Sequence, residues 1–488
     1  MNYHNITGTK RAKKRSVPAA VLSVVLTFFA LYGCAVTPGT DAPGDTGSVS
    51  APATNRSAGV TPETSITATP EVSPTQEISP APSPTEEPTQ APKPVFPENE
   101  YNIGTPDEAA LKYIAALKAP EKEILTAEQI AAANARMTAG SDSLIDILKI
   151  PESIDGNELA ALINAPAVPG LPLFDQTGAE IGEAELKSIL DGRNTGAIAE
   201  KEPVRAGIIV RRTDLKKVPS YKEFHSAAGT AVDRIQDTEL YVGMPVWILW
   251  HSTDGAFVFV RSYYYTGWIK AEDVAAAQNA EEWFAFAVPE EFIVITEHKC
   301  DIDGKQADMG VKLPYAGIDG GGENVSALMP LRNEDGSLGT RNVTLPVTSA
   351  HIGYLKYTYA NFIAQAFKYV GTGYSWGGLN GGIDCSSYVA SVLRTFGFYL
   401  PRDTKDQNGT AGRGVAISGM SAAEIKKLLI SVGADAPVAL YTNGHVRFYL
   451  GETDGTVMTI HAPGSNKTVT TARFENFDSL ISIRVIDG

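Results

Sequence analysis

Cysteine is scarce in this chain of 488 residues, which contains only Cys34, Cys300 and Cys385. A sparse and odd set excludes a disulfide framework and any zinc site made of cysteines alone. The seven histidines also form no close ligand pattern, such as HExxH. We therefore expect neither a bound metal nor another cofactor, and each cysteine needs its own explanation.

Positively charged residues are also few compared with negatively charged ones. The chain carries 41 Lys and Arg residues against 56 Asp and Glu residues, which gives a formal net charge of −15. A chain this acidic does not suit the tracking of a phosphate backbone. We expect no nucleic-acid partner, and we expect the protein to be a monomer.

An apolar stretch near the N-terminus, residues 17–33, follows a segment rich in Lys and Arg. This order is typical of an export signal, and the stretch is short for a membrane-spanning helix, which needs about 20 residues. It ends in an LYGC motif that resembles the lipobox of bacterial lipoproteins, although Tyr32 is bulkier than the usual residue. The resemblance implies that residues 1–33 are a lipoprotein signal peptide and that Cys34 carries a lipid. An uncleaved signal anchor is the alternative, and both interpretations place the rest of the chain outside the cytoplasm. With the lipid on Cys34, we expect it to be anchored at the outer face of a bacterial membrane.

Residues 34–97 differ sharply in composition from the rest of the chain. Thirteen of the 30 prolines lie between positions 35 and 97, among Thr, Ser, Ala and Glu. Such a segment cannot bury enough apolar surface to offset its chain entropy, so we expect a disordered tether. The tether would hold a folded head away from a membrane surface.

Residues 98–207 read as a helical arm. Thr126 precedes Gln129 by three positions, which is the spacing of a capping box at a helix start. Ile130, Ala133 and Met137 follow at helical intervals and predict one buried face. No catalytic or binding motif is found in this segment, so we expect the arm to pack on the domains that follow.

Residues 208–280 consist of short β-branched and aromatic runs separated by turns, which predicts a small β-barrel. The string DRIQDTELYVGMPVWILWHSTDGAFVFVRSYYYTGWIKAEDVA resembles a bacterial SH3-like domain of cell-wall enzymes. Residues 281–350 repeat the pattern more weakly and resemble a second such barrel. We expect Cys300 to lie between the first two strands of this second barrel as a buried, inert thiol.

Residues 351–488 carry the candidate chemistry. The segment 357–369 has the spacing of a core helix, and a second helix is predicted to begin near Cys385 with Asp384 as its N-cap. A cysteine in the first turn of a helix faces unpaired backbone N–H groups and the positive end of the helix dipole. Both effects favour the thiolate, which is the nucleophilic form.

A nucleophilic thiol also needs a base. In the predicted strand HVRFYLG, His445 lies on the polar side together with Arg447 and Tyr449, and from there an imidazole can approach a helix N-terminus. His461 lies on a neighbouring predicted strand, where its ring could orient that of His445. A cysteine, a base and an orienting group together form the arrangement that covalent acyl transfer requires. Each of these three residues by itself is weak evidence for a catalytic site.

The strings YSWGGLNGGIDCSSYV, LPRDTKDQ, GHVRFYLG and IHA resemble the NlpC family of papain-like cell-wall cysteine peptidases, and the upstream segments resemble its members with two SH3-like domains. The resemblance implies an α+β fold: a papain-like catalytic domain preceded by two small SH3-like β-barrels and a helical arm. It implies Cys385 as nucleophile, His445 as base and His461 as the third polar residue. It also implies that six further residues line the substrate groove: Tyr374, Asp384, Ser386, Arg402, Asp403 and Thr404.

The resemblance implies hydrolysis of peptidoglycan stem peptides or muropeptides, commonly between γ-D-glutamate and a diamino acid. Two alternatives remain: an amidase that cuts the muramoyl–L-alanine bond, and a non-catalytic wall-binding lipoprotein. Tyr265 is our candidate for a barrel residue that reaches the groove, although it could equally be one more strand aromatic. Arg447 departs from the family pattern, because a glycine is common two residues after the base.

Overall fold

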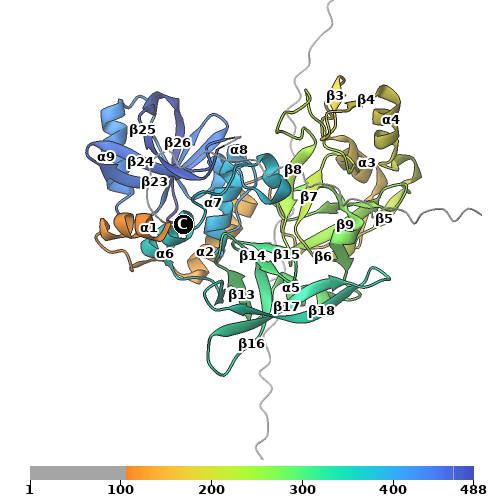
Figure 1. Cartoon of the computed structure of the whole chain (residues 1–488), viewed down its shortest axis with the longest axis horizontal. Coiled ribbons are helices and arrows are strands. Elements are labelled where there is room, and N and C mark those ends of the chain that lie inside the picture. The colour runs from red at the N-terminus through yellow and green to blue at the C-terminus, as the bar shows by residue number, and fades with distance from the viewer. Residues whose placement is uncertain (1–105, 465–466) are drawn as a thin grey trace, which may run out of the picture. The chain divides into compact units, whose positions relative to one another are not determined.

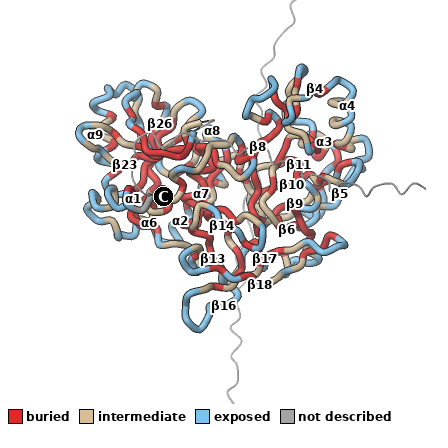
Figure 2. Tube along the Cα trace, viewed as in Figure 1, coloured by how far each residue is buried: buried red, intermediate tan, exposed pale blue. Residues whose placement is uncertain are grey.

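Residues 106–464 and 467–488 are described by a computed structural model of the chain (Figure 1). The predicted signal peptide, the predicted tether and Cys34 lie outside these residues. Within them, no helix is both long enough and apolar enough to cross a membrane. Figure 2 shows that the buried residues gather in the β-sheets and in α7 (Cys385–Arg394), the helix that carries the candidate nucleophile.

The segment predicted to be a helical arm combines helices with short strands, and its two halves pack on different neighbours. In the first half, α1 packs against α6 (Tyr359–Phe367), and β1 pairs with β20 (Tyr357–Thr358). In the second half, Leu159 of α3 shares a buried cluster with Trp268 of the first barrel. The predicted arm is therefore helical in its longer elements and packs on the domains that follow, but it also contains short strands that the sequence did not indicate. Its elements are α1 (Pro106–Ala115), β1 (Glu123–Leu125), α2 (Ala127–Ala139), β2 (Ser153–Asp155), α3 (Gly156–Asn164), β3 (Leu173–Phe174), β4 (Glu180–Ile181), α4 (Glu183–Asp191), η1 (Thr195–Ala197) and β5 (Lys201–Pro203).

The predicted start of α2 is confirmed. The hydroxyl of Thr126 accepts a hydrogen bond from the backbone N–H of Gln129, and Gln129 Oε1 accepts one from the backbone N–H of Thr126 at 2.8 Å. This reciprocal pair satisfies two N–H groups that have no partner within the helix. Ile130, Ala133 and Met137 are buried, as their spacing predicts.

The first barrel is a seven-stranded antiparallel sheet with the order β12-β6-β9-β10-β11-β7-β8. The runs predicted at 246–250, 256–260 and 267–269 form three of these strands, β9, β10 and β11. These strands are buried on both faces: Val260 and Ile269 join one buried cluster, and Phe259 and Trp268, whose rings lie 5.3 Å apart, join another. The elements are β6 (Arg205–Ile209), β7 (Thr213–Lys216), β8 (Gln236–Leu240), β9 (Pro245–His251), β10 (Phe257–Arg261), β11 (Thr266–Lys270), η2 (Ala271–Asp273) and β12 (Val274–Ala276).

The second sheet has five antiparallel strands in the order β18-β17-β16-β13-β19, and a separate hairpin is formed by β14 and β15. Cys300 lies between β13 and β16 along the chain, as predicted, but it lies on β14 of the separate hairpin, opposite Ala307, and the sequence did not indicate this hairpin. Cys300 is half-buried; its burial and nearby Asp308 raise the thiol pKa to about 11, so it stays protonated at neutral pH. The elements are α5 (Ala280–Ala287), β13 (Phe292–Ile295), β14 (Lys299–Ile302), β15 (Lys305–Asp308), β16 (Lys312–Ile318), β17 (Asn324–Arg332), β18 (Leu338–Pro346) and β19 (Ala350–Ile352).

The last domain is a six-stranded antiparallel sheet with the order β21-β26-β22-β23-β24-β25. Both α7 and α9 pack on the central strand β23. Val446, Phe448 and Leu450 of β23 join the cluster that contains α7, as their alternation predicts. Tyr449, expected on a polar side, is buried in the cluster that contains α9. Beyond β20 and α6, the elements are η3 (Trp376–Gly381), α7 (Cys385–Arg394), α8 (Thr404–Thr410), β21 (Arg413–Val415), α9 (Ala422–Val432), β22 (Val438–Thr442), β23 (His445–Thr453), β24 (Thr456–His461), β25 (Thr470–Phe474), η4 (Phe477–Ser479) and β26 (Leu480–Val485).

Candidate active site

Cys385 is the first residue of α7, and Asp384 is the N-cap of this helix, as predicted. One Asp384 oxygen accepts a hydrogen bond from the backbone N–H of Ser387 at 2.9 Å, and the hydroxyl of Ser387 accepts one from the backbone N–H of Asp384 at 3.0 Å. Every residue of α7 is buried, which fixes the helix between the sheet and its neighbours. The cysteine therefore stands at a rigid, capped helix N-terminus.

Arg402 holds Asp384 in place through two parallel hydrogen bonds. Its Nη2 donates to Asp384 Oδ2 at 2.6 Å, and its Nη1 donates to Asp384 Oδ1 at 3.1 Å. Nη1 also donates to the hydroxyl of Ser386 at 3.0 Å. This bidentate contact holds the pKa of the Asp384 carboxyl below its usual value although burial opposes it. Arg402 and Ser386 are buried, so here they position the start of α7, and their contact with a substrate stays a prediction.

His445 and His461 lie on neighbouring strands and contact each other through their rings. His445 Nε2 and His461 Nδ1 are 2.7 Å apart, and the ring centroids are separated by 5.0 Å at an interplanar angle of 73°. The backbone N–H of Val446, the residue after His445, donates a hydrogen bond to the Cys385 sulfur. The structure thus brings together the three residues predicted to carry out catalysis.

Burial sets the protonation of these groups. It raises the pKa of the Cys385 thiol, and the charge of Asp384 adds to this effect. Burial and the positive charge of Arg447 lower the pKa of His445 to about 4, and burial, Arg447 and the neighbouring His445 lower that of His461 to about 2. A neutral thiol therefore faces a neutral imidazole near pH 7, in contrast to the thiolate expected from the helix N-terminus.

Thr404 lies beside the sulfur of Cys385, and Tyr374 is close enough for its charge to interact with that of the thiolate. Thr404 Oγ1 is 3.6 Å from Cys385 Sγ. Burial raises the pKa of the Tyr374 phenol well above its usual value, and the negative charges of Asp384 and Cys385 raise it further. The phenol therefore keeps its proton. A protonated phenol close to the nucleophile can donate a hydrogen bond to an oxygen that gains negative charge during attack.

Two residues of the first barrel complete the site, and pattern reasoning missed both. Arg402 Nε donates to Thr238 Oγ1 at 2.6 Å, and its Nη2 lies 3.3 Å from Glu239 Oε2. The hydroxyl of Tyr264 donates to the backbone carbonyl of Glu239 at 2.7 Å. Thr238 and Glu239 lie in β8 and carry no motif, so nothing in the sequence indicated that they hold the arginine of another domain.

Tyr265 and Asp403, both predicted to line the groove, approach one another across these two domains. Burial raises the pKa of Tyr265, and the carboxylates of Asp237 and Asp403 raise it further. Asp237, which sequence analysis also missed, has a pKa raised to about 6 by burial, although its ion pair with Lys217 at 3.5 Å opposes this shift. The barrel thus contributes a tyrosine and a carboxylate near the turn that carries Asp403.

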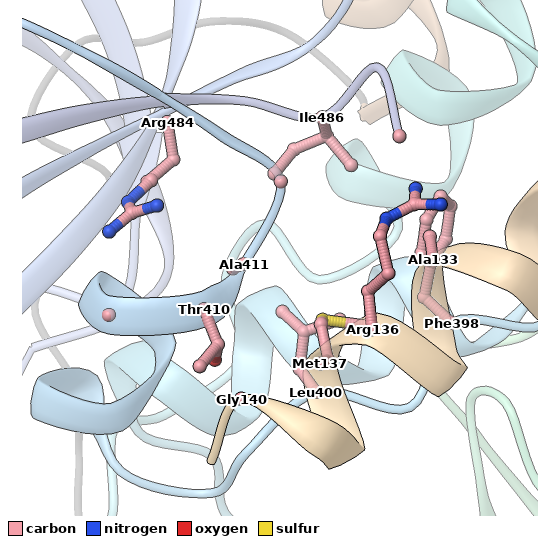
Figure 3. A pocket seen from close by; sticks show the side chains of 13 residues that line it. Ala133, Arg136, Met137, Gly140, Phe398, Leu400, Thr410, Ala411, Arg484 and Ile486 are labelled. Carbon is pink, nitrogen blue, oxygen red and sulfur yellow. The ribbon is translucent and has the colours of Figure 1, made fainter.

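A cavity of about 280 Å³ lies at the far end of α8 from Thr404 (Figure 3). Arg136 and Met137 of α2 line it, together with Thr410 and Arg484. None of the predicted site residues lines this cavity. Residues 106–464 and 467–488 also contain no cluster of three His, Cys, Asp or Glu side chains that could hold a metal.

A helix-borne cysteine beside two hydrogen-bonded histidines on a sheet defines the class of papain-like cysteine peptidases. The family model described as SH3 domain (SH3b1 type) matches residues 219–270, and the NlpC/P60 family model matches residues 371–478. The chain therefore carries an SH3b domain followed by an NlpC/P60 domain, and the predicted resemblance and α+β fold class are confirmed.

Two known proteins are similar to parts of this chain. The chain is 33% identical over 115 residues to the gamma-D-glutamyl-L-lysine dipeptidyl-peptidase of Bacillus subtilis (strain 168); the match covers 23% of this chain and 35% of the relative, about a third of its length. A solved NlpC/P60 endopeptidase from Photobacterium damselae subsp. piscicida superposes with a TM-score of 0.60 at 18% identity, covering 78% of this chain and 96% of that one. The second likeness shows the shared fold.

Proposed function

We propose that this protein is a peptidoglycan hydrolase that cleaves stem peptides between γ-D-glutamate and a diamino acid. The observation that carries the proposal is the placement of Cys385 at a capped helix N-terminus beside the hydrogen-bonded pair of His445 and His461. The bond specificity is supported by the name of the Bacillus subtilis relative, which refers to a γ-D-glutamyl-L-lysine substrate.

The proposed reaction proceeds in two half-reactions. His445 removes the proton from the Cys385 thiol as the sulfur attacks the carbonyl carbon of the scissile amide, and the carbonyl oxygen becomes negative. The Tyr374 phenol donates to this oxygen. When the C–N bond breaks, protonated His445 gives its proton to the leaving amine, and a thioester remains. Water, deprotonated by His445, then attacks the thioester and releases the acid and the thiol.

The acidic end of the site suits the amino-terminal half of a stem peptide. Asp237 is half-buried, whereas Asp403 is exposed, and partial loss of water around them raises the pKa of each carboxyl. Bringing a cation beside them would offset that cost. We infer that the amino group of the peptide lies here, with Tyr265 closing the groove from the barrel side.

Defined substrates test the proposal. The full chain is incubated with L-Ala-γ-D-Glu-meso-diaminopimelate, its L-lysine counterpart and a muramoyl pentapeptide, and the products are identified by mass spectrometry. We expect L-Ala-D-Glu and a free diamino acid from the first two. Release of an intact peptide from the muramoyl group would indicate an amidase instead. Wall binding without any product, equal for the wild type and Cys385→Ala, would indicate a non-catalytic wall protein.

We also propose that the protein is exported and anchored by a lipid on Cys34. The proposal is supported by the basic segment, the short apolar stretch and the LYGC motif. Growth of an expressing bacterium with labelled fatty acid should label the wild type and not Cys34→Ser. Equal labelling of the two proteins would exclude a lipid on this cysteine.

A further inference from the structure

An open hollow lies on the catalytic sheet, and Arg447, two residues after His445, is among the residues that line it. It is lined by the turn between β22 and β23, by β23 itself, by the end of β25 and by the residues that follow β25. Most of its polar side chains are hydrogen-bond donors, and one carboxylate accompanies them. These polar residues are Thr442, Asn443, Arg447, Arg473, Glu475, Asn476 and Ser479.

Arg447 connects this hollow to the catalytic pair. It follows His445 by two residues on β23, so both side chains lie on one face of the strand. The register of β23 and β24 pairs Phe448 with Ile460, which places Arg447 beside His461. The guanidinium lies over the ring of Phe474, 5.0 Å from its centroid, and so reaches into the hollow.

The charge of Arg447 has no counterpart among residues 106–464 and 467–488. Arg447 forms no ion pair with them, and its Nε is buried without a hydrogen-bond partner. Arg473, on the exposed side of β25, likewise forms no ion pair within these ranges. Leaving a partly dehydrated guanidinium without an anion costs free energy, which a bound carboxylate would offset through charge-assisted hydrogen bonds.

The two ends of the candidate site therefore carry opposite charge. Asp237 and Asp403 form an acidic end, whereas Arg447 and Arg473 form a basic end beyond the histidines. The first half of the stem peptide carries an amino group at its far end and the α-carboxylate of the γ-linked glutamate beside the scissile bond, and the leaving half carries a further carboxylate. The acidic end would repel that carboxylate, and the basic end would attract it.

We propose that the hollow binds a carboxylate of the leaving half of the substrate, so that Arg447 and Arg473 select peptides with a free carboxylate after the scissile bond. This proposal rests on the proposed endopeptidase function. The hollow is a binding site for that carboxylate and takes no part in bond breaking.

Paired substrates test the proposal. L-Ala-γ-D-Glu-L-Lys is compared with the same peptide carrying a C-terminal amide, for the wild type, Arg447→Gln, Arg473→Gln and Arg205→Gln, using the full chain in detergent. Arg205 lies exposed on β6 of the barrel and serves as the matched control. Assays at about pH 8 keep His445 neutral in every variant. kcat and KM are measured separately.

We expect the wild type to prefer the free acid by about tenfold or more in kcat/KM, as the loss of a charge-assisted contact implies. Arg447→Gln and Arg473→Gln should each reduce this preference mainly through a higher KM for the acid, and Arg205→Gln should keep it. Equal cleavage of acid and amide by the wild type would overturn the proposal, as would an unchanged preference in both Arg447→Gln and Arg473→Gln. Cleavage of neither peptide by the wild type would instead contradict the proposed endopeptidase function.

Discussion

At Cys385 two physical effects oppose each other. The N-terminus of α7 favours a negative sulfur, but the cysteine is only 6% exposed, and burial beside Asp384 raises the thiol pKa. A buried neutral thiol gains little from the helix alone. In the proposed mechanism its reactivity therefore depends on proton removal by His445 at the moment of attack, which makes the two histidines unequal.

Substitution of the two histidines should separate their roles. In the proposed mechanism His445 moves protons in both half-reactions, so His445→Ala should lose several orders of magnitude in kcat/KM, close to Cys385→Ala. His461 only orients the base and stabilises its protonated form. His461→Asn keeps a hydrogen-bonding group and should lose about ten- to a hundredfold. The measurement is kcat/KM on one γ-D-glutamyl peptide after circular dichroism has checked folding; equal losses for His445→Ala and His461→Asn would show that the roles are assigned wrongly.

The pH dependence should follow the pKa of His445. Only the neutral imidazole can act as base, so kcat/KM should rise with pH through about pH 4 and then level off. Arg447 lowers this pKa, and Arg447→Gln should therefore move the acid limb to higher pH. Arg205→Gln removes a charge from the first barrel and should leave the pH of this rise in kcat/KM unchanged. If the rise of kcat/KM in Arg447→Gln occurred at the same pH as in the wild type, or at a lower pH, Arg447 would not be what lowers the pKa of His445.

At the scale of elements, η3 connects the first barrel to the N-cap of α7. Its Gly377 and Gly378 have φ values of 62° and 67°, a region that side chains disfavour. The backbone N–H of Gly377 donates to Asp384 Oδ2 at 3.0 Å, and its carbonyl accepts from Gln236 of β8 at 2.9 Å. A Cβ at Gly378 would lie 2.2 Å from Glu239 Oε2. This loop thus leaves no room for a side chain where it meets the barrel.

Gly378→Ala should therefore disturb both stability and catalysis. Backbone strain at a positive φ costs about 1 kcal/mol, and displacement of Glu239 from its close contact adds to this cost. Gly419→Ala is a matched control, because Gly419 has a φ of 77° but no atom within 4 Å of a new Cβ. We expect Gly378→Ala to lower the melting temperature more than Gly419→Ala and to lower kcat/KM as well. Equal shifts in Tm with unchanged kcat/KM would show that η3 has no such role.

Sequence patterns predicted those features that residues close together in the chain determine. The capping box at Thr126, the N-cap at Asp384 and the alternation in β23 all depend on residues a few positions apart. What the sequence could not predict depends on distant contacts. Arg402 meets Glu239 across 163 positions, and no spacing rule connects them. The division of the arm between two neighbours and the place of Cys300 inside a strand have the same origin, because tertiary pairing decides them.

At the scale of the whole folded part, one buried cluster runs through every domain. It includes Met137 of the arm, Tyr264 of the first barrel, Met309 after the hairpin of the second sheet and Tyr388 of α7. An apolar core shared in this way makes the domains depend on one another. We therefore expect residues 106–488 to unfold in one transition rather than domain by domain.

The ion pair between Arg402 and Glu239 allows this dependence to be measured. Both side chains are buried, so Glu239→Ala should leave part of the Arg402 charge uncompensated between two domains and cost about 3 kcal/mol. Glu185→Ala removes a carboxylate from the half-exposed pair with Lys222 and should cost about 1 kcal/mol or less. In scanning calorimetry of the full chain, Glu239→Ala should shift one undivided transition to a clearly lower temperature than Glu185→Ala does. It should also lower kcat/KM, because Arg402 holds Asp384 at the start of the helix that carries Cys385. A separate barrel transition, or a Tm shift no larger than that of Glu185→Ala, would mean that the domains are stable independently of this contact.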